Sequence, residues 1–197
     1  SLQFGCDPDW NAYGDPEIPQ PRPPVDPAVY PYRHAGGHIH VGDMLDKGIR
    51  YSDIFNQGRD PQTLVRLMDL LIGVPCVMID RDPGNIMRRR IYGQAGSYRV
   101  QPHGVEYRTL SNFWMRSPAL YSLVAGISRI CVGYWRADKN IAESILALVP
   151  EKLVQKAIIP SGFSGSVQHT PRPLVAVIRK VIRRASTLAN VDFCTLV

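Results

Sequence analysis

Polar and apolar residues alternate in two segments of the chain, and a period of two predicts β-strands. The first segment is AGGHIHVG at 35–42, where Ile39 and Val41 are the apolar positions. The second covers residues 91–109, where alternation around glycines and one proline predicts two strands joined by a turn. We expect the strand at 35–42 to pair with them.

Other segments show the spacing of amphipathic helices. Asp60 and Pro61 form a helix start signal, and the apolar stripe after them predicts a helix that ends at Gly73. Further helices are predicted near 118–132, 138–149 and 173–189. The C-terminal third is therefore expected to be mainly helical.

A proline-rich stretch separates the predicted strands from the start of the chain. Seven of the sixteen residues from Pro16 to Pro31 are proline. Since proline has no backbone N–H and a fixed φ, this stretch cannot be a helix interior or a central strand. We predict an extended surface connection.

Composition narrows the class of protein without defining its activity. The 197 residues are 45% hydrophobic, which fits one globular domain, or one with a small appendage, and excludes a disordered chain or a coiled coil. The four cysteines are widely spread without a CxxC pair, which indicates buried thiols in a reducing compartment. Neither a secretion signal nor a membrane span is predicted. The first residue, Ser1, and the LQF that follows suggest a fragment that lacks its N-terminal part.

The positive charge is uneven. The net charge of +6 includes five Arg against one Glu from Arg88 to Arg108, and seven Lys or Arg against two acids from Glu151 onwards. A solvated basic face is the default interpretation of Arg88–Arg90. The basic C-terminal stretch could bind nucleic acid, although a docked amphipathic helix is its ordinary role.

Two predicted strands carry candidate chemistry. Residues two apart in a strand leave the same face, so His38 and His40 project together, and Glu106 and Arg108 do likewise. If both polar faces belong to one side of a sheet, two imidazoles, a carboxylate and a guanidinium converge. Such a set favours a metal or phosphate site.

The residue types leave the ligand partly open. Imidazole, carboxylate and water suit zinc, manganese or magnesium, and the surplus of arginine implies an anionic ligand. Neither GxxxxGK[ST] nor GxGxxG occurs, so a nucleotide would be bound through metal and arginine. A metal-dependent hydrolase that uses the HxH pair, and a non-enzymatic nucleic-acid-binding protein, remain alternatives.

Three runs of sequence resemble a known family. FGCDPDWNAY, RHAGGHIHVG and RRRIYGQAGSYRVQPHGVEYRTLSNFW, within residues 4–114, are similar to phage-type carboxylate-amine ligases, a branch of the glutamine synthetase and glutamate-cysteine ligase superfamily. The resemblance implies an α+β fold: a curved, mainly antiparallel sheet backed by helices, as part of a glutamine synthetase-like catalytic domain. Residues 1–135 would belong to that domain, and 136–197 would be its mainly helical C-terminal part.

The same resemblance implies an ATP-dependent ligase that works through an acyl phosphate with Mg²⁺ or Mn²⁺. It assigns metal binding to His38 and Glu106, nucleotide binding to His40, and substrate or phosphoryl charge to Arg108, with Arg99 as a candidate for the same work. We also expect Arg89 and Arg90 to bind the nucleotide. We expect an amino-acid-like or peptide substrate, no membrane and no nucleic acid as partners, and the cytoplasm of an infected bacterium as location. The oligomeric state is left open, with a homo-oligomer as one option.

Two departures from the superfamily pattern affect this site. Its RxExR motif has no first arginine here, because His103 and Gly104 precede Val105. Further acidic metal ligands of the superfamily lie upstream of the matched region. Asp7 and Asp9 are nearby carboxylates, and for their DPD sequence a turn and a functional role carry equal weight.

Overall fold

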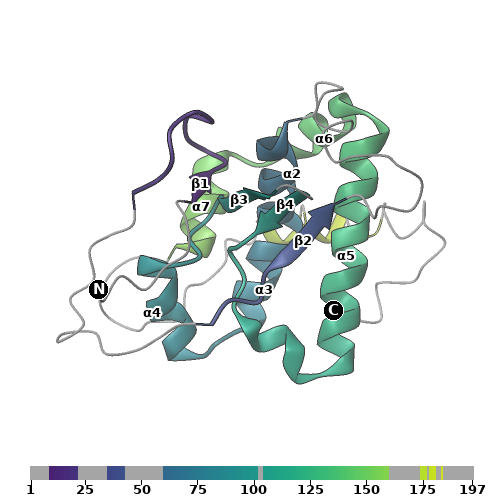
Figure 1. Ribbon diagram of the computed structural model, residues 1–197. Helices are drawn as coiled ribbons and strands as arrows, with labels where there is room; N and C mark the ends of the chain where they lie inside the picture. The colour runs from purple at the N-terminus through teal and green to yellow at the C-terminus, as the bar shows by residue number, and fades with distance from the viewer. Residues whose placement is uncertain are drawn as a thin grey trace.

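The computed structural model describes residues 9–21, 35–42, 60–101 and 104–159, together with 174–176, 178–180 and 183. Among these residues, four antiparallel strands and a layer of helices form a mixed fold, as Figure 1 shows, which confirms the predicted α+β class. The strands are β1 (Trp10–Asn11), β2 (Ile39–Gly42), β3 (Ser97–Gln101) and β4 (Gly104–Tyr107). The helices are α2 (Pro61–Met68), the π-helical η1 (Asp69–Gly73), α3 (Val74–Ile79), α4 (Pro83–Ile91), the 3₁₀ turn η2 (Asn112–Arg116), α5 (Pro118–Ala137), α6 (Lys139–Leu146) and α7 (Glu151–Ile158).

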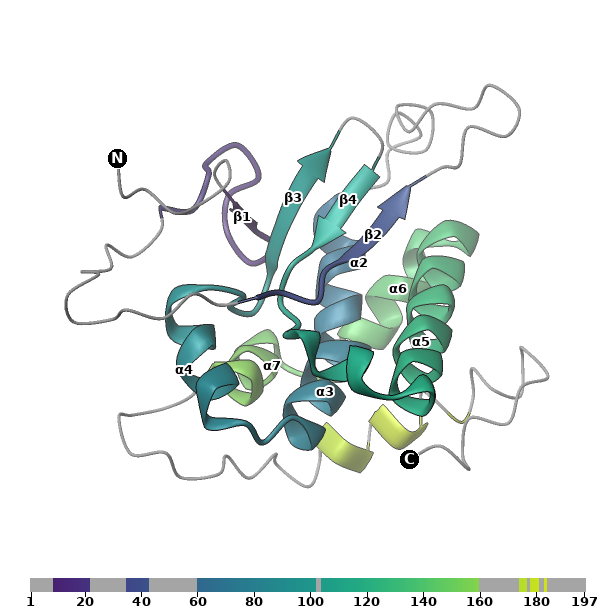
Figure 2. The same cartoon turned by 60° about the horizontal axis from the view of Figure 1, so that its bottom comes forward.

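The strands lie side by side in the order β1-β3-β4-β2, as Figure 2 shows. β3 pairs with β4, and β2 pairs with β4, so both pairings expected from the alternation are confirmed. In this register His40 lies opposite Glu106, and Glu106 lies opposite Arg99. Since directly opposed residues in an antiparallel pair share a face, these three side chains leave the same side of the sheet.

The other side of the sheet packs on the helices. Tyr98, Val105 and Tyr107 point to that side, and each is at most 1% exposed. The stretch α2–η1–α3 lies behind the strands (Figure 2) and is the most buried part of the core. Its apolar residues at 1% exposure or less are Leu64, Val65, Leu67, Met68, Leu70, Leu71, Ile72 and Val74. Burial of each large aliphatic side chain contributes about 1.5–3 kcal/mol.

The helix predicted to end at Gly73 continues beyond it. The π-helical segment η1 (Asp69–Gly73) leads directly into α3, and Gly73 has ordinary right-handed helical dihedrals. A glycine that caps a helix usually has positive φ, so Gly73 serves another purpose. A Cβ at this position would press on the hydroxyl of Tyr107 and on Ile158. The glycine therefore permits close packing rather than a stop.

The stretch Pro61–Ile79 is long and apolar enough to cross a membrane by length and composition, with a mean hydropathy of 1.6 in its most apolar window. However, 67% of that window is buried inside the protein. A core helix of this kind passes the same test, so the stretch is weak evidence for a membrane span.

Cys76 and Cys131 are buried free thiols, as predicted; Cys6 and Cys194 lie outside the described residues.

Residues before β3 form a helix that the sequence analysis did not predict. Asp82 caps α4 by accepting a hydrogen bond from the Gly84 N–H, and Pro83 occupies the first turn. This start signal repeats the Asp60–Pro61 pattern of α2. The solvated basic face expected at Arg88–Arg90 is wrong for Arg88 and Arg89, which are 0% and 4% exposed.

The helices predicted near 118–132 and 138–149 occur as α5 and α6. α7 was not predicted, and the described residues between 174 and 183 are helical, with Leu174 and Ile178 buried. Residues 16–21 of the proline-rich stretch are mostly exposed. The predictions for the rest of that stretch, for Asp7 and for His103 lie outside the described residues.

One buried carboxylate joins the helices to the sheet. Asp69, at 0% exposure, accepts hydrogen bonds from the Tyr107 hydroxyl at 2.7 Å, the Gly96 N–H at 2.6 Å and the Thr109 hydroxyl at 3.2 Å. Tyr13 is a further donor to it. Burial raises the pKa of Asp69 to about 6, and these hydrogen bonds oppose the rise.

This raised pKa predicts a pH-dependent stability difference between the wild type and Asp69→Asn. Between an unfolded pKa near 3.8 and a folded pKa of about 6, the folded state keeps a proton that the unfolded state has released. The contribution of Asp69 to stability therefore falls as pH rises through this range, by about 3 kcal/mol. Urea unfolding at pH 4 and pH 7 should show the variant gaining on the wild type at the higher pH. A difference that is independent of pH would contradict this prediction.

Candidate functional site

The polar face of the sheet carries two adjacent rows of side chains. The first row follows the strand register and contains Arg99, Glu106 and His40, with Asp9 beside Arg99 immediately before β1. The second lies two residues along each strand, where Arg108 follows β4 and His38 precedes β2. The structure therefore brings together four of the residues that the sequence analysis singled out as metal or charge ligands: His38, Glu106, Arg99 and Arg108.

Glu106 lies at the centre of these four residues and contacts each of the other three. Its Oε1 lies 2.5 Å from His38 Nδ1 and 2.6 Å from Arg108 Nη1. Its Oε2 accepts a hydrogen bond from Gln101 Nε2 at 3.1 Å and lies 3.7 Å from Arg99 Nη1. Glu106, Arg99 and Arg108 are 4%, 7% and 1% exposed, so the group is largely removed from water. Burial of these charges is tolerable because they are paired.

Asp9 is a second carboxylate of this cluster. Its Oδ1 lies 3.0 Å from Arg99 Nη2 and 3.1 Å from Arg108 Nε, and the residue is 8% exposed. The sequence analysis gave Asp9 equal weight as a turn residue and left it out of the predicted site. Two carboxylates therefore balance two guanidiniums at the centre of the polar face.

Two glycines before β2 place His38. The Gly37 N–H donates to the Leu110 carbonyl at 3.0 Å, and the Gly37 carbonyl accepts from Trp114 Nε1 at 3.2 Å. A Cβ at Gly36 would overlap the imidazole of His38, and a Cβ at Gly37 would overlap Ser111 and Trp114. The double glycine is therefore required for the close approach that brings His38 to Glu106.

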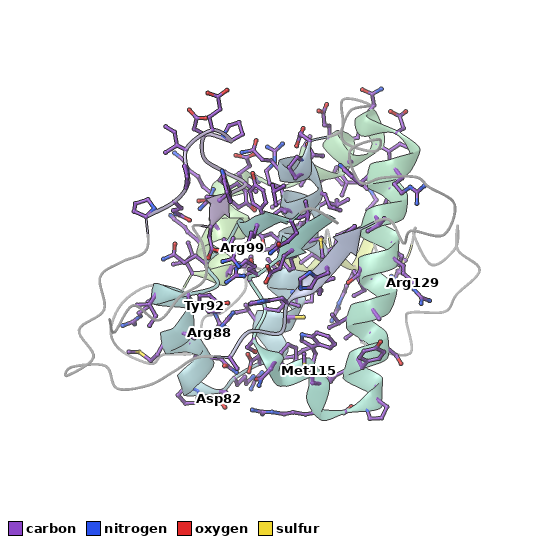
Figure 3. All side chains as sticks on the ribbon, viewed as in Figure 1. Asp82, Arg88, Tyr92, Arg99, Met115 and Arg129 are labelled. Carbon is purple, nitrogen blue, oxygen red and sulfur yellow. The ribbon has the colours of Figure 1, made fainter. Side chains whose placement is uncertain are left out.

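The remaining predicted residues lie at different distances from this centre. His40 shares the face of Glu106 but is exposed. Arg88 and Arg89 lie on α4, and Arg89 Nη1 is 3.9 Å from the buried Asp80 rather than on the polar face. Arg90 is half-buried on the same helix. Figure 3 shows Arg88 near Tyr92, while Arg129 lies across the molecule on α5.

The local charges shift the pKa values of the central pair. Burial, reinforced by the charge of Arg108, lowers the pKa of His38 to about 4, so the imidazole is neutral at pH 7. Burial alone would raise the pKa of Glu106, but the hydrogen bond from Gln101 and the charge of Arg108 outweigh it and hold that pKa below its ordinary value. The contact between them is therefore a hydrogen bond from neutral imidazole to carboxylate.

The fit of a divalent cation to these residues is partial. Within the described ranges no group of three His, Cys, Asp or Glu side chains is arranged to hold a metal ion. His38 and Glu106 face one another and would have to give up their contact to hold a cation. Magnesium is commonly bound by one or two carboxylates, with waters and substrate phosphates as its other ligands. A site with His38 and Glu106 as its protein ligands is therefore compatible with magnesium.

The missing arginine of the RxExR motif has a structural explanation. That position is Gly104, where a Cβ would overlap the backbone of Val41 and Gly42 on the paired strand. Arg99 instead reaches Glu106 from the neighbouring strand β3, directly opposite it in the register. A guanidinium is thus supplied across the sheet rather than from the same strand.

The surroundings of Gly36 and Gly133 predict opposite effects on stability when each glycine is replaced by alanine. Gly36→Ala should displace the imidazole and lower the free energy of unfolding by about 1–3 kcal/mol, the usual cost of overpacking. Gly133→Ala, in α5 with no atom within 4 Å of the added Cβ, should raise it by about 0.5–1 kcal/mol. Urea unfolding measures both. A Gly36→Ala protein as stable as the wild type would show that His38 is not confined in this way.

Comparison with known proteins gives one result. The sequence profile of the family described as phage phiEco32-like COOH.NH2 ligase-type 2 matches residues 28–132, which is more than half of the chain. The match includes β2, β3 and β4 and the residues that surround Glu106. No curated protein and no solved structure matches the chain significantly. The chain belongs to the phage phiEco32-like COOH.NH2 ligase-type 2 family.

Proposed function

We propose that this protein is an ATP-dependent ligase that joins a carboxylate to an amine through an acyl phosphate. The family name gives the carboxylate-amine ligase reaction. ATP dependence and the intermediate are supported by the chemistry of the polar face. Transfer of a γ-phosphoryl group to a carboxylate brings two anions together, and Arg99 and Arg108 are two buried cations beside one another.

The observation that supports this proposal most directly is that His38 Nδ1 and Arg108 Nη1 both contact Oε1 of Glu106. The resemblance to the glutamine synthetase superfamily implies metal ligands on an HxH strand and on an ExR strand, and in this protein those two strands pair. We propose His38 and Glu106 as ligands of Mg²⁺ or Mn²⁺, which when bound would neutralise charge on the triphosphate. The exposed His40 lies on the same face and is suited to contact the nucleotide.

In the proposed reaction the substrate carboxylate attacks the γ-phosphorus of ATP, and ADP leaves. Arg99 and Arg108 stabilise the negative charge on the transferring group and orient the carboxylate. The amine then attacks the acyl carbon, phosphate leaves, and the amine nitrogen loses a proton. Of the two arginines assigned to the nucleotide from the sequence, half-buried Arg90 keeps that proposed role, whereas Arg89 is buried and faces Asp80.

The proposed substrate is an amino acid or a peptide, and no membrane or nucleic acid is required. The proposed location is the cytoplasm of an infected bacterium. These points rest on the family and on the reduced state expected of buried thiols.

The test is a comparison of Glu106→Gln with the wild type, both expressed and purified in the same way. The wild type should release phosphate from ATP in the presence of one member of an amino-acid and peptide panel. Glu106→Gln should lose about a hundredfold or more of that rate, because the carboxylate that organises both cations is gone. Glu143→Gln, an exposed position on α6, is the matched control and should retain full activity.

Other outcomes identify the alternatives. Unchanged ATP-dependent amide formation in Glu106→Gln would refute the assignment. Hydrolysis without ATP, accompanied by bound zinc, would favour the metal-dependent hydrolase. Nucleic-acid binding that falls steeply with salt and persists without His38 and Glu106 would favour the binding protein.

A further inference from the structure

Tyr92 contacts two residues of the proposed site, and the sequence analysis gave it no role although it lies in the run that begins at Arg88. It follows α4 as the C-cap residue, where its N–H donates to the Arg88 carbonyl at 2.7 Å and its backbone is extended. Its hydroxyl lies 2.8 Å from His38 Nε2 and 2.7 Å from Arg108 Nη2. Figure 3 shows it beside Arg88, between α4 and the strands.

The chemistry of these contacts determines where each proton lies. A guanidinium can only donate, so Arg108 Nη2 donates to the phenolic oxygen. The phenolic hydrogen is then directed to His38 Nε2, which must accept. A neutral imidazole that accepts at Nε2 carries its proton at Nδ1, and Nδ1 is the atom that faces Glu106 Oε1.

The four side chains therefore form a closed ring of hydrogen bonds. Arg108 donates to Tyr92, Tyr92 to His38, and His38 to Glu106, while the second terminal nitrogen of Arg108 donates to the same oxygen of Glu106. Each group has one orientation that satisfies its neighbours. Removal of the phenolic oxygen would leave His38 Nε2 and Arg108 Nη2 without this shared partner.

A second arginine holds the phenol ring in place. The guanidinium of Arg88 lies 4.8 Å from the Tyr92 ring centroid and that of Arg108 lies 5.2 Å from it. Arg88 also donates to the carbonyls of Thr109 and Arg108, at 3.0 and 3.2 Å. Arg88 thus connects the ring of Tyr92 to the backbone that carries Arg108, and this explains why it is fully buried on α4.

We propose that Tyr92 is a positioning residue of this site: its hydroxyl, in contact with His38 Nε2 and Arg108 Nη2, fixes the placement of both side chains beside one oxygen of Glu106. The importance of Tyr92 for catalysis rests on the function proposed above. Its contacts with His38 and Arg108 do not depend on that function, and they can be tested without ATP. Groups that orient the primary ligands of a site commonly alter its activity 10–100-fold when removed.

The experiment compares Tyr92→Phe with the wild type at pH 7, with Tyr121→Phe as control. Phenylalanine keeps the ring and its contacts with the arginines and removes only the oxygen. Tyr121 is an exposed tyrosine on α5, 57% accessible. Long-range ¹H–¹⁵N NMR correlations of ¹⁵N-histidine protein give the tautomer of His38, whose signals are identified by their absence in His38→Asn.

All three proteins should show His38 with its proton on Nδ1, because the Glu106 carboxylate still accepts there in Tyr92→Phe. In Tyr92→Phe the ¹⁵N signal of Nε2 should lie at higher frequency than in the wild type and Tyr121→Phe, because this nitrogen loses the hydrogen bond from the phenol. The ligase rate of Tyr92→Phe should fall by about 10–100-fold, mainly in kcat, with a similar unfolding midpoint. A wild-type proton on Nε2, or an Nε2 signal that does not move in Tyr92→Phe, would overturn the proposal. A shifted Nε2 signal in a Tyr92→Phe comparison, in a protein without ligase activity, would support the role of Tyr92 and count against the proposed function alone.

Discussion

The alternation of side chains along residues 106–109 is the constraint on which the rest of the structure depends. Glu106 and Arg108 leave one side of the sheet and join the charged cluster, while Tyr107 and Thr109 leave the other side and donate to Asp69. A shift of register by one residue would place the charged pair against the helices and the Asp69 partners on the polar face. One four-residue stretch thus joins the core to the candidate site.

Both sides of this stretch bury carboxylates, and each is satisfied differently. Asp69 accepts neutral donors from the turn before β3 and from the end of β4, which ties η1 to the sheet. Glu106 and Asp9 are paired with arginines instead, so their charge is compensated where they lie. Hydrogen bonds and ion pairs of this kind are weak net stabilisers but costly to break on one side only. The arrangement therefore specifies orientation more than it adds stability.

Much of the sheet was predictable because its signals are local. The alternation of AGGHIHVG and GVEYR predicted the strands, their pairing and the shared face of His38, Glu106 and Arg108. The parts that were missed depend on distant contacts. Asp9 reaches Arg99 across ninety positions of sequence, and the burial of Arg88 depends on carbonyls twenty residues away. Only α4 had an overlooked local signal, the Asp82–Pro83 start that repeats Asp60–Pro61.

The central claim is that the cluster around Glu106 is where a nucleotide-bound cation and the reacting carboxylate meet. Its most direct test is anomalous diffraction from crystals of the protein grown with Mn²⁺ and a non-hydrolysable ATP analogue. The account predicts a manganese peak in direct contact with Glu106 and His38, with the triphosphate beside Arg99 and Arg108. A peak elsewhere, with Glu106 still paired to His38 and Arg108, would contradict it.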